Sequence, residues 1–519
     1  MQYVLGAGDV GHEQLEMGFN PIMSDVLEKF KPVFEPRSVA FVGASNTPMK
    51  WGFQVPFNLV KFGYDGKVYP VNPHESEILG LKVYRTIAEV PEKPVDLAVV
   101  TVPARGVLDV LKECAAAGVR AALVVAGGFG ELGAEGARIE AELARVARES
   151  GMLLVGPNCM GVVSPHPRNL YCEMPAVKPE AGNIAMASQS GNVAATLMGL
   201  VVKHRLGMSR FVSTGNEAVL HMEDYIEYFG ADPLTSVIAT YIEGLEDGRG
   251  FLNVTRDVNK EKPVVVLKVG GTEAGKRAAK SHTGALGGSR QIFHGACRQA
   301  GLTEVVDIEE MMDVVGAFAR QPLPRGRRVG IVTVGGGSGV LGADACADSG
   351  LDVVSFSDNV LKELDSFLPP FWSRGNPVDL IGAFVERSMV RSTEILLRSD
   401  KIDGVIVLGV GFGARWAAMY RNRGLIENEF HEQLATIAVE QDVDTSRTLA
   451  KLIDEYRKPV IVASSVLATA HEDQNEAIFA LFDEGVIVYP TPRRAARAFA
   501  HLAARHDYLA SVGASVKAE

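Results

Sequence analysis

Cysteine is scarce in this sequence, and no two cysteines have the spacing of a metal site or of a redox motif. The chain contains five cysteines in 519 residues. They are scattered and odd in number, which argues against a disulfide framework and against a CxxC zinc or thioredoxin-like site. We therefore expect reduced, mostly buried thiols and no metal ion bound to this chain. The five are Cys114, Cys159, Cys172, Cys297 and Cys346.

An excess of basic residues and a long apolar run are also absent. Lysine and arginine number 52 against 63 aspartate and glutamate residues, and the formal net charge is −11, so the surface offers no basic excess to a nucleic-acid backbone. The first residues lack the basic stretch and continuous apolar run of a signal peptide, and no window approaches the roughly 20 apolar residues that cross a bilayer. We expect a cytoplasmic protein that binds neither nucleic acid nor membranes.

The sequence is rich in a regular alternation of short apolar runs with helical patterns. Runs such as "RSVAFVGAS" (37–45) are typical of buried parallel strands, and stretches such as "AEGARIEAELARVARES" (134–150) have helical apolar spacing. This alternation predicts βαβ units, and the length corresponds to three or four domains of about 150 residues. Stretches that resemble links divide the alternation at 164–182 and 320–328. We expect an α/β fold of three successive doubly wound domains at 33–165, 180–322 and 326–505, after an N-terminal extension (1–32).

The first strand-to-helix turn, residues 42–52, is a candidate ligand site, because ligands of open α/β sheets lie beyond the carboxyl ends of the strands. It lacks the dinucleotide fingerprint GxGxxG, since Ser45 and Pro48 stand where glycine is needed. The second strand ends in Asn72 and a proline rather than in an acidic residue for a ribose, which also disfavours NAD. A phosphate-bearing ligand held by backbone N–H groups and the charge of Lys50, or a plain turn, both remain compatible with the sequence.

Two further turns rich in glycine precede helices and are candidate anion sites. One follows the strand "NIAMAS" (183–188), and the other follows a strand that ends near residue 333. Free N–H groups and the helix dipole attract anions at such helix N-termini, whereas ordinary N-capping explains one serine of the first turn. The candidates are Ser188, Gln189, Ser190, Gly191 and Asn192 in the first turn and Gly335, Gly336, Gly337, Ser338 and Gly339 in the second.

His282 is the candidate nucleophile of the chain. It lies in the small-residue stretch "RAAKSHTGALGG" (277–288), which follows a buried strand on the ligand side of the sheet. A neutral histidine attacks phosphorus well when an acceptor fixes one of its ring nitrogens. Glu243, at the carboxyl end of the apolar strand "TSVIATYIEG" (235–244), is a candidate acceptor. From spacing alone, the simpler interpretation is an ordinary loop histidine and a solvated carboxylate at the end of a strand.

Seven motifs, taken in order, resemble the NDP-forming acyl-CoA synthetases, a family that includes succinyl-CoA synthetase and the ADP-forming acetyl-CoA synthetases. The resemblance covers about residues 33 to 500 and is to the α subunit of the latter enzymes. It implies a Rossmann-like CoA-binding domain followed by two flavodoxin-like CoA-ligase domains. The motifs are "SVAFVGAS", "VYPVNP", "GPNCMG", "SQSGN", "YIEG", "LKVGGTEAGKRAAKSHTGALGGS" and "GNPVDL".

The resemblance implies a role for each candidate residue. His282 would be transiently phosphorylated, Glu243 would orient and stabilise its imidazole, and the two helix N-termini would cradle the phosphohistidine. CoA would lie over Gly43, Ala44, Ser45, Lys50, Val71, Asn72, Pro73, Val102 and Pro103.

The three units leave no stretch long enough for the ATP-grasp module that such enzymes need. The resemblance therefore implies a separate ATP-grasp β subunit, in an α2β2 hetero-oligomer, that binds ATP or GTP with Mg²⁺. The reaction would convert a small carboxylic acid, CoA and a nucleoside triphosphate to acyl-CoA, a nucleoside diphosphate and phosphate through an acyl phosphate. The alternative is a CoA-binding regulatory or scaffold subunit without ligase activity.

Several positions depart from the family pattern. His74 and Glu217 stand where relatives often have lysine, and "GGGSG" (335–339) replaces GGPG. The segment 411–446 looks longer than in the usual third domain. Its Trp416 and its arginines suit an unusual acid, a partner interface or, more simply, a solvated helix face.

Overall fold

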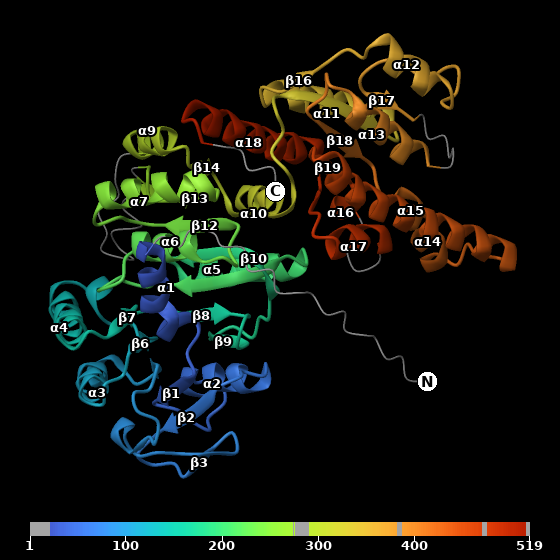
Figure 1. Ribbon diagram of the computed structural model, residues 1–519. Helices are drawn as coiled ribbons and strands as arrows, with labels where there is room; N and C mark the ends of the chain where they lie inside the picture. Colours follow the sequence, from blue (N-terminus) through green and yellow to red (C-terminus); the bar gives the residue numbers. More distant parts are fainter. Residues whose placement is uncertain (1–20, 273, 276–289, 381–386, 470–474, 515–519) are drawn as a thin grey trace.

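The computed structural model describes residues 21–272, 274–275, 290–380, 387–469 and 475–514. Three α/β units follow one another along the chain, coloured blue to teal, green, and yellow to red in Figure 1. Each unit has its own mainly parallel sheet. The prediction of three successive doubly wound α/β domains is confirmed. None of the described helices is long and apolar enough to cross a membrane.

The first unit is a five-stranded parallel sheet covered by helices. Its strands are β1 (Ser38–Val42), β2 (Lys67–Val71), β5 (Leu97–Val100), β6 (Ala121–Val124) and β7 (Leu153–Val155), with a small hairpin of β3 (Glu77–Ile78) and β4 (Leu81–Lys82). Its helices are α2 (Trp51–Lys61), η1 (Ile87–Glu89), α3 (Ala104–Ala116), η2 (Gly130–Leu132) and α4 (Ala134–Ser150). The strand order is β2-β1-β5-β6-β7. The connections reverse between β1 and β5, so ligands are expected beyond the carboxyl ends of these two strands.

The second unit has a seven-stranded sheet in the order β14-β13-β12-β10-β11-β8-β9. Its strands are β8 (Gly161–Ser164), β9 (Leu170–Glu173), β10 (Glu180–Ser188), β11 (Gly207–Ser213), β12 (Val237–Ile242), β13 (Val264–Lys268) and β14 (Thr303–Val305), and its helices are α5 (Gly191–Lys203), α6 (Met222–Ala231), α7 (Gly248–Glu261), α9 (Arg290–Ala300) and α10 (Ile308–Arg320). The hairpin β8–β9 extends the sheet beyond β11, with β8 pairing antiparallel to β11. The stretch 164–182 therefore contributes strands to this sheet and is not only a link. Its prolines had indicated a link between domains.

The third unit is a parallel sheet built around β15 (Arg328–Thr333). Its other strands are β16 (Asp352–Val353), β17 (Val378–Asp379), β18 (Gly404–Leu408), β19 (Val460–Ala463) and β20 (Val488–Tyr489). Its helices are α11 (Gly336–Asp348), α12 (Asp358–Asp365), α13 (Ser388–Arg398), α14 (Phe412–Asn422), α15 (Glu429–Tyr456), α16 (Val466–Thr469), α17 (Glu476–Asp483) and α18 (Pro492–Ser511). The short strands β16 and β17 pair with opposite ends of β15.

The N-terminal helix α1 (Pro21–Phe34) packs on α6 of the second unit (Figure 1). The ring of Phe34 stacks on that of Tyr228, with centroids 4.7 Å apart. Beside them, the buried guanidinium of Arg210 lies 2.7 Å from a carboxylate oxygen of Glu35 and 3.3 Å from one of Asp232. A buried charge is tolerated only when it is paired and hydrogen-bonded, so this cluster ties the end of α1 to the second sheet.

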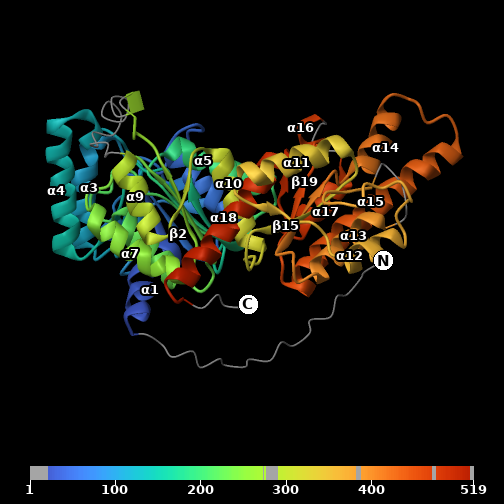
Figure 2. The ribbon, with the colours of Figure 1, turned by 90° about the horizontal axis from the view of Figure 1, so that it is seen from above.

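The C-terminal helix α18 joins the third unit to the second. In Figures 1 and 2 it lies against α10. Arg494 makes two hydrogen bonds, of 2.6 and 2.8 Å, to the carboxylate of Asp313 on α10. Near its other end, Arg505 donates to the backbone and side-chain oxygens of Asn259, each at 3.0 Å, and burial lowers the pKa of Arg505 to about 10. The second and third units therefore meet through specific polar contacts.

Candidate functional site

The first-unit turn brings together several of the predicted CoA contacts. Gly43 has a φ of +92°, and its N–H donates to the carbonyl of Val71 at 3.0 Å. The side-chain amide of Asn72 donates to the carbonyl of Ala44 at 2.7 Å. A methyl group at position 43 would lie 2.9 Å from Cγ1 of Val102. The turn at β1, the end of β2 and the end of β5 thus form one close-packed group at the reversal point of the sheet.

Two N–H groups that we expected to face a phosphate are used within the protein. Gly43 donates to the strand β2, and the N–H of Ser45 donates to the carbonyl of Gly52 at 2.9 Å. A donor that already has a carbonyl partner is less available to a ligand, and the contact of this turn with a phosphate stays a prediction. Lys50 lies exposed immediately before α2, where its ammonium group can meet an anion. Pro73 and Pro103 are exposed at the neighbouring strand ends.

Replacing Gly43 by alanine is expected to weaken CoA binding and to destabilise the first unit by about 1–3 kcal/mol, because alanine strains this φ and its methyl group meets Val102. Gly63 is a matched control, since its φ is +81° but no atom lies within 4 Å of the added methyl group. Urea unfolding and calorimetry with CoA measure both effects. Equal CoA affinity for Gly43→Ala and Gly63→Ala would remove the turn from the binding site.

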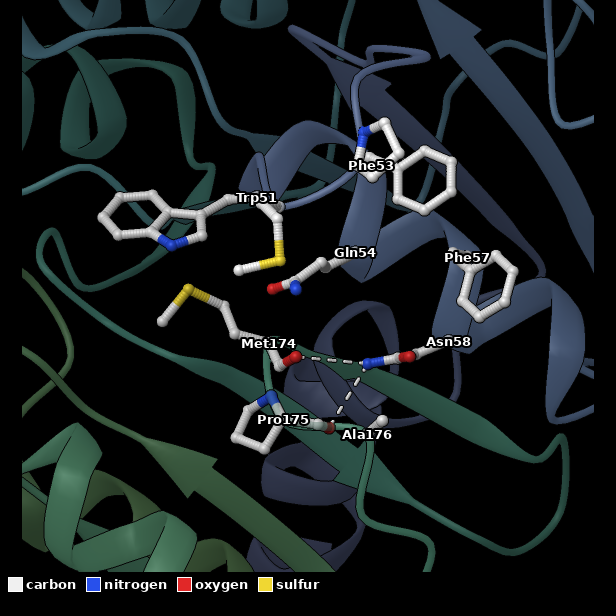
Figure 3. A pocket seen from close by; sticks show the side chains of 10 residues that line it. Trp51, Phe53, Gln54, Phe57, Asn58, Met174, Pro175 and Ala176 are labelled. Carbon is white, nitrogen blue, oxygen red and sulfur yellow. Dashed lines mark hydrogen bonds between the residues drawn. The ribbon is translucent and has the colours of Figure 1, made fainter.

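An apolar groove opens beside this turn, between α2 and the segment that follows β9 (Figure 3). Its volume is about 530 Å³. Trp51, Gln54 and Met174 point into it, and the side chain of Asn58 donates to the carbonyls of Met174 and Pro175 at 3.3 and 3.2 Å, which fixes one wall. Aromatic and sulfur-bearing walls with few polar groups are typical of ligand pockets. The groove therefore enlarges the candidate ligand surface beyond the turn itself.

The turn after β10 uses both of its serines to build the start of α5. Ser190 is the N-cap of this helix, and its hydroxyl accepts from the N–H of Val193 at 3.5 Å. The buried hydroxyl of Ser188 donates to the carbonyl of Ser190 at 2.8 Å. N-capping therefore explains the hydroxyl of Ser190, and the hydroxyl of Ser188 is used in a local hydrogen bond within the turn. Gly191 and the exposed Asn192 form the first turn of the helix, where the dipole is positive.

Gln189, in the same turn, holds the backbone that carries Glu243. Its side-chain oxygen accepts from the N–H groups of Glu243 and Gly244 at 2.6 and 3.0 Å. Its amide nitrogen donates to the carbonyl of Gly244 at 2.9 Å. The structure thus brings two of the predicted site residues, Gln189 and Glu243, into direct contact at the carboxyl ends of β10 and β12.

Lys268 is a member of this site that sequence reasoning missed. It ends β13, and its ammonium group donates to the carbonyls of Glu243 and Val269 at 2.7 and 2.5 Å. Burial lowers the pKa of Lys268, while the charge of Glu243 acts to raise it. A single lysine at the end of the apolar run "PVVVLK" was the available signal.

Glu217 is a second residue that the sequence did not place at the site. It is buried, and its carboxylate accepts from the hydroxyl of Thr214 at 2.8 Å and from the N–H of Met222 at 3.3 Å. Burial raises the pKa of Glu217 to about 7, against hydrogen bonds from Thr214 and Gln189 that lower it. The sequence singled out this position only because relatives often have lysine there. In the structure, the side chain at this position lies near Gln189.

The third-unit turn has a carboxylate at its helix N-terminus. Gly335 is the N-cap of α11, and its N–H donates to the hydroxyl of Thr333 at 3.3 Å. A methyl group at Gly336 would lie 2.9 Å from a carboxylate oxygen of Asp379, which ends β17. Gly337 and Ser338 are exposed in the first turn, and Gly339 is buried. Asp379 belongs to the "GNPVDL" motif, but its position beside a candidate anion site was not predicted.

The segment 411–446, left open by the sequence, forms α14 and most of α15. The ring of Trp416 lies on that of Tyr420, with centroids 4.4 Å apart, and Arg421 hydrogen-bonds to Glu432 across the two helices. The two helices lie at the far end of the third unit in Figures 1 and 2. These contacts account for the tryptophan and for one arginine as parts of a helical hairpin.

His282 lies outside the described residues, as does the rest of 276–289. Its predicted partner Glu243 is half-buried at the end of β12. Within the described part of the chain, no group of three or more histidine, cysteine, aspartate or glutamate side chains is arranged to hold a metal ion.

Three family models match the chain in the order of the three units. The CoA binding domain matches residues 37–165, the succinyl-CoA ligase like flavodoxin domain matches 181–318, and the ligase-CoA domain matches 329–514.

Named relatives and a solved structure agree with these matches. The α subunit of acetate–CoA ligase [ADP-forming] I from Pyrococcus furiosus is 37% identical over 476 residues, which cover 91% of this chain and 96% of that protein. Acetate–CoA ligase [ADP-forming] from Methanocaldococcus jannaschii is 39% identical, and the match covers 68% of this chain and 49% of that protein. The dinucleotide forming acetyl-coenzyme A synthetase 1 of Ca. Korarchaeum cryptofilum, solved with phosphate and ADP, aligns with a TM-score of 0.79 and 34% identity over 94% of this chain and 99% of that chain.

Proposed function

The chain belongs to the NDP-forming acyl-CoA synthetase family, and we propose that it is the α subunit of an ADP-forming acid–CoA ligase. The observation that carries the proposal is the match to an α subunit over nearly the full length of both chains. The reaction would be acid + CoA + ATP ⇌ acyl-CoA + ADP + phosphate. The proposal assigns this chain the CoA site, the phosphohistidine and the transfer of the acyl group.

The described residues support a separate role for each part of the site. Lys50 and the close-packed turn at Gly43 would hold CoA at the reversal point of the first sheet. Glu243, fixed by Gln189 and Lys268, would orient the imidazole of His282. The positive N-terminus of α5 would stabilise the phosphoryl group on His282. The phosphoryl group then passes to the carboxylate of the acid, and the CoA thiol attacks the resulting acyl phosphate and releases phosphate.

The partner would be an ATP-grasp subunit that binds ATP with Mg²⁺. The name of the α-subunit relative supports a second subunit, and the single-chain relative from M. jannaschii is about twice as long as the part that this chain matches. We propose an α2β2 assembly in the cytoplasm. The five cysteines are all free and buried, which is in keeping with a reducing compartment.

The proposal is tested with the purified chain, its partner subunit, ATP-Mg²⁺ and a panel of small carboxylic acids. ADP formation should require both CoA and one of the acids, and it should be accompanied by the matching acyl-CoA. Calorimetry on the chain alone should show tighter binding of CoA than of NAD, because the first turn lacks the dinucleotide fingerprint. Binding of CoA without acyl-CoA formation from any acid would favour the regulatory alternative, and tighter binding of NAD would favour an oxidoreductase.

A further inference from the structure

The apolar groove beside α2 is flanked by two of the proposed ligand-binding turns. At one end, α2 begins against the CoA turn, since a methyl group at Gly52 would lie 2.2 Å from the carbonyl oxygen of Gly43. At the other end, the N–H of the groove residue Met174 donates to the carbonyl of Met160 at 3.2 Å. A methyl group at Gly191, in the first turn of α5, would lie 3.3 Å from Cβ of Met160. The groove therefore lies next to both the CoA turn and the helix end proposed to hold the phosphoryl group.

The lining of the groove presents large apolar side chains to solvent. Met49 is 82% exposed and Trp51 is 43% exposed, and Met174 lines the wall across from them. Met49 also has a φ of +72°, a backbone conformation that costs energy for a long side chain and that recurs at ligand-binding sites. Exposed apolar side chains gathered in one hollow mark a binding surface. The groove therefore has the character of a site for an apolar group.

The polar groups on the lining side chains are too few for the pantetheine arm of CoA. The amide nitrogen of Asn58 already donates to the carbonyls of Met174 and Pro175. The lining side chains then offer the amide of Gln54 and the indole N–H of Trp51. Pantetheine has two amides, and burying an amide without hydrogen-bond partners is costly. A hydrocarbon group with at most one polar substituent matches this lining better.

The size and the walls of the groove indicate which hydrocarbon group. A volume of about 530 Å³ is in the range of pockets that enclose a drug-sized molecule, about 300–1,000 Å³. The single methyl group of acetate would leave most of this volume empty. An aromatic ring packs favourably against an indole and against thioether sulfur atoms, which Trp51, Met49 and Met174 supply.

We infer that this groove holds the aromatic ring of the carboxylic acid substrate, and that the ligase acts on aryl acids in preference to acetate. The carboxylate of the acid would lie toward α5, where the phosphoryl group is proposed to arrive, and the CoA thiol would approach from the turn at Gly43. The inference rests on the proposed function, since it requires the acid to react between these two turns.

The inference is tested with the reconstituted pair, by kcat/KM of ADP formation with phenylacetate, cyclohexylacetate and acetate. The wild type should prefer phenylacetate to acetate at least about tenfold, because an aromatic ring buries more apolar surface than a methyl group. It should prefer phenylacetate to cyclohexylacetate at least about threefold. Trp51→Ala removes a wall, and Ala176→Phe adds a ring at an exposed position of the lining. Each should lower the preference for phenylacetate over acetate at least about fivefold, through a higher KM for phenylacetate.

Val60→Phe is the matched control, because it adds the same ring at an exposed position of α2 that does not line the groove. It should keep the wild-type preference. A wild type that forms ADP with no acid of any kind would overturn the proposed function and the inference with it. ADP formation with a preference for acetate, or an unchanged preference in both groove variants, would overturn the inference alone. Equal use of cyclohexylacetate would overturn the assignment to an aromatic ring.

Two binding measurements on Ala176→Phe separate the acid from other occupants of the groove. Calorimetry should show CoA affinity within about twofold of the wild type, and titration with the partner subunit should show unchanged assembly. Weaker CoA binding would assign the groove to the arm of CoA, and weaker assembly would assign it to the subunit interface. Either result would overturn the inference.

Discussion

Replacing His282 by alanine will abolish the acid-labile phosphoryl label that the wild-type chain acquires from its partner subunit and ATP-Mg²⁺. The expected loss of acyl-CoA formation is at least about 10³-fold. The proposed covalent intermediate cannot form without the imidazole, and correct orientation of the substrates does not replace it. CoA binding should stay unchanged, since His282 follows β13 in the second unit and the predicted CoA contacts lie in the first. Phosphate release in acid, with stability in base, identifies the labelled group as phosphohistidine.

A second histidine of the same unit provides the control. Nδ1 of His294 on α9 lies 2.6 Å from a carboxylate oxygen of Glu304, so this exposed histidine is paired with a glutamate, as we propose for His282. His294→Ala should label at the wild-type rate and yield. Persistence of the label in His282→Ala, or its loss in His294→Ala, would assign the phosphoryl group to another residue and would contradict the role given to the stretch 277–288.

The fold was predictable because buried parallel strands leave a strong pattern in the sequence. "SVAFV" in β1 is buried at all five positions, and such runs recur with helices between them. The hairpin β8–β9 was not predictable in the same way. Its strands are four residues each and are separated by a proline-rich turn, so local composition indicated a link, whereas pairing with β11 decides the structure.

The sequence predicted where the candidate turns lie, but it predicted the hydrogen bonds of their backbone groups only in part. Glycines at strand ends locate turns well, since Gly43 does adopt a φ of +92°. Whether the N–H groups of a turn are free depends on partners that are distant in sequence. Ser45 donates to Gly52 and Gly43 donates to Val71, and these pairings follow from packing rather than from the motif.

The residues that sequence reasoning missed reach the site through tertiary contacts. Lys268 and Glu243 end two neighbouring strands, and their contact depends on the parallel register of β12 and β13. Glu217 accepts a hydrogen bond from Thr214, whose N–H donates to the carbonyl of Ser188, so its position requires the turn after β11 to fold back on the turn after β10. A single sequence gives no measure of such distances, so only the unusual residue types pointed to these positions.

Glu243→Gln will lower the yield of phosphohistidine about 10²-fold while CoA affinity remains within about twofold of the wild type. The backbone of Glu243 is held independently of its carboxylate, by Gln189 on its N–H and by Lys268 on its carbonyl. The substitution therefore removes the charge that would favour a cationic or phosphorylated imidazole, and it leaves the backbone in place.

The control for this substitution is Glu246→Gln, three residues further along the same segment, where the side chain is 81% exposed. It should label like the wild type, because solvent and salt screen the charge of an exposed carboxylate. The pKa of Lys268 supplies an independent readout in Glu243→Gln. The charge of Glu243 opposes the effect of burial on Lys268, so its removal should lower the pKa of that lysine further. Loss of CoA binding in Glu243→Gln would instead place this carboxylate in the CoA site, and an unchanged label would deny it any role toward His282.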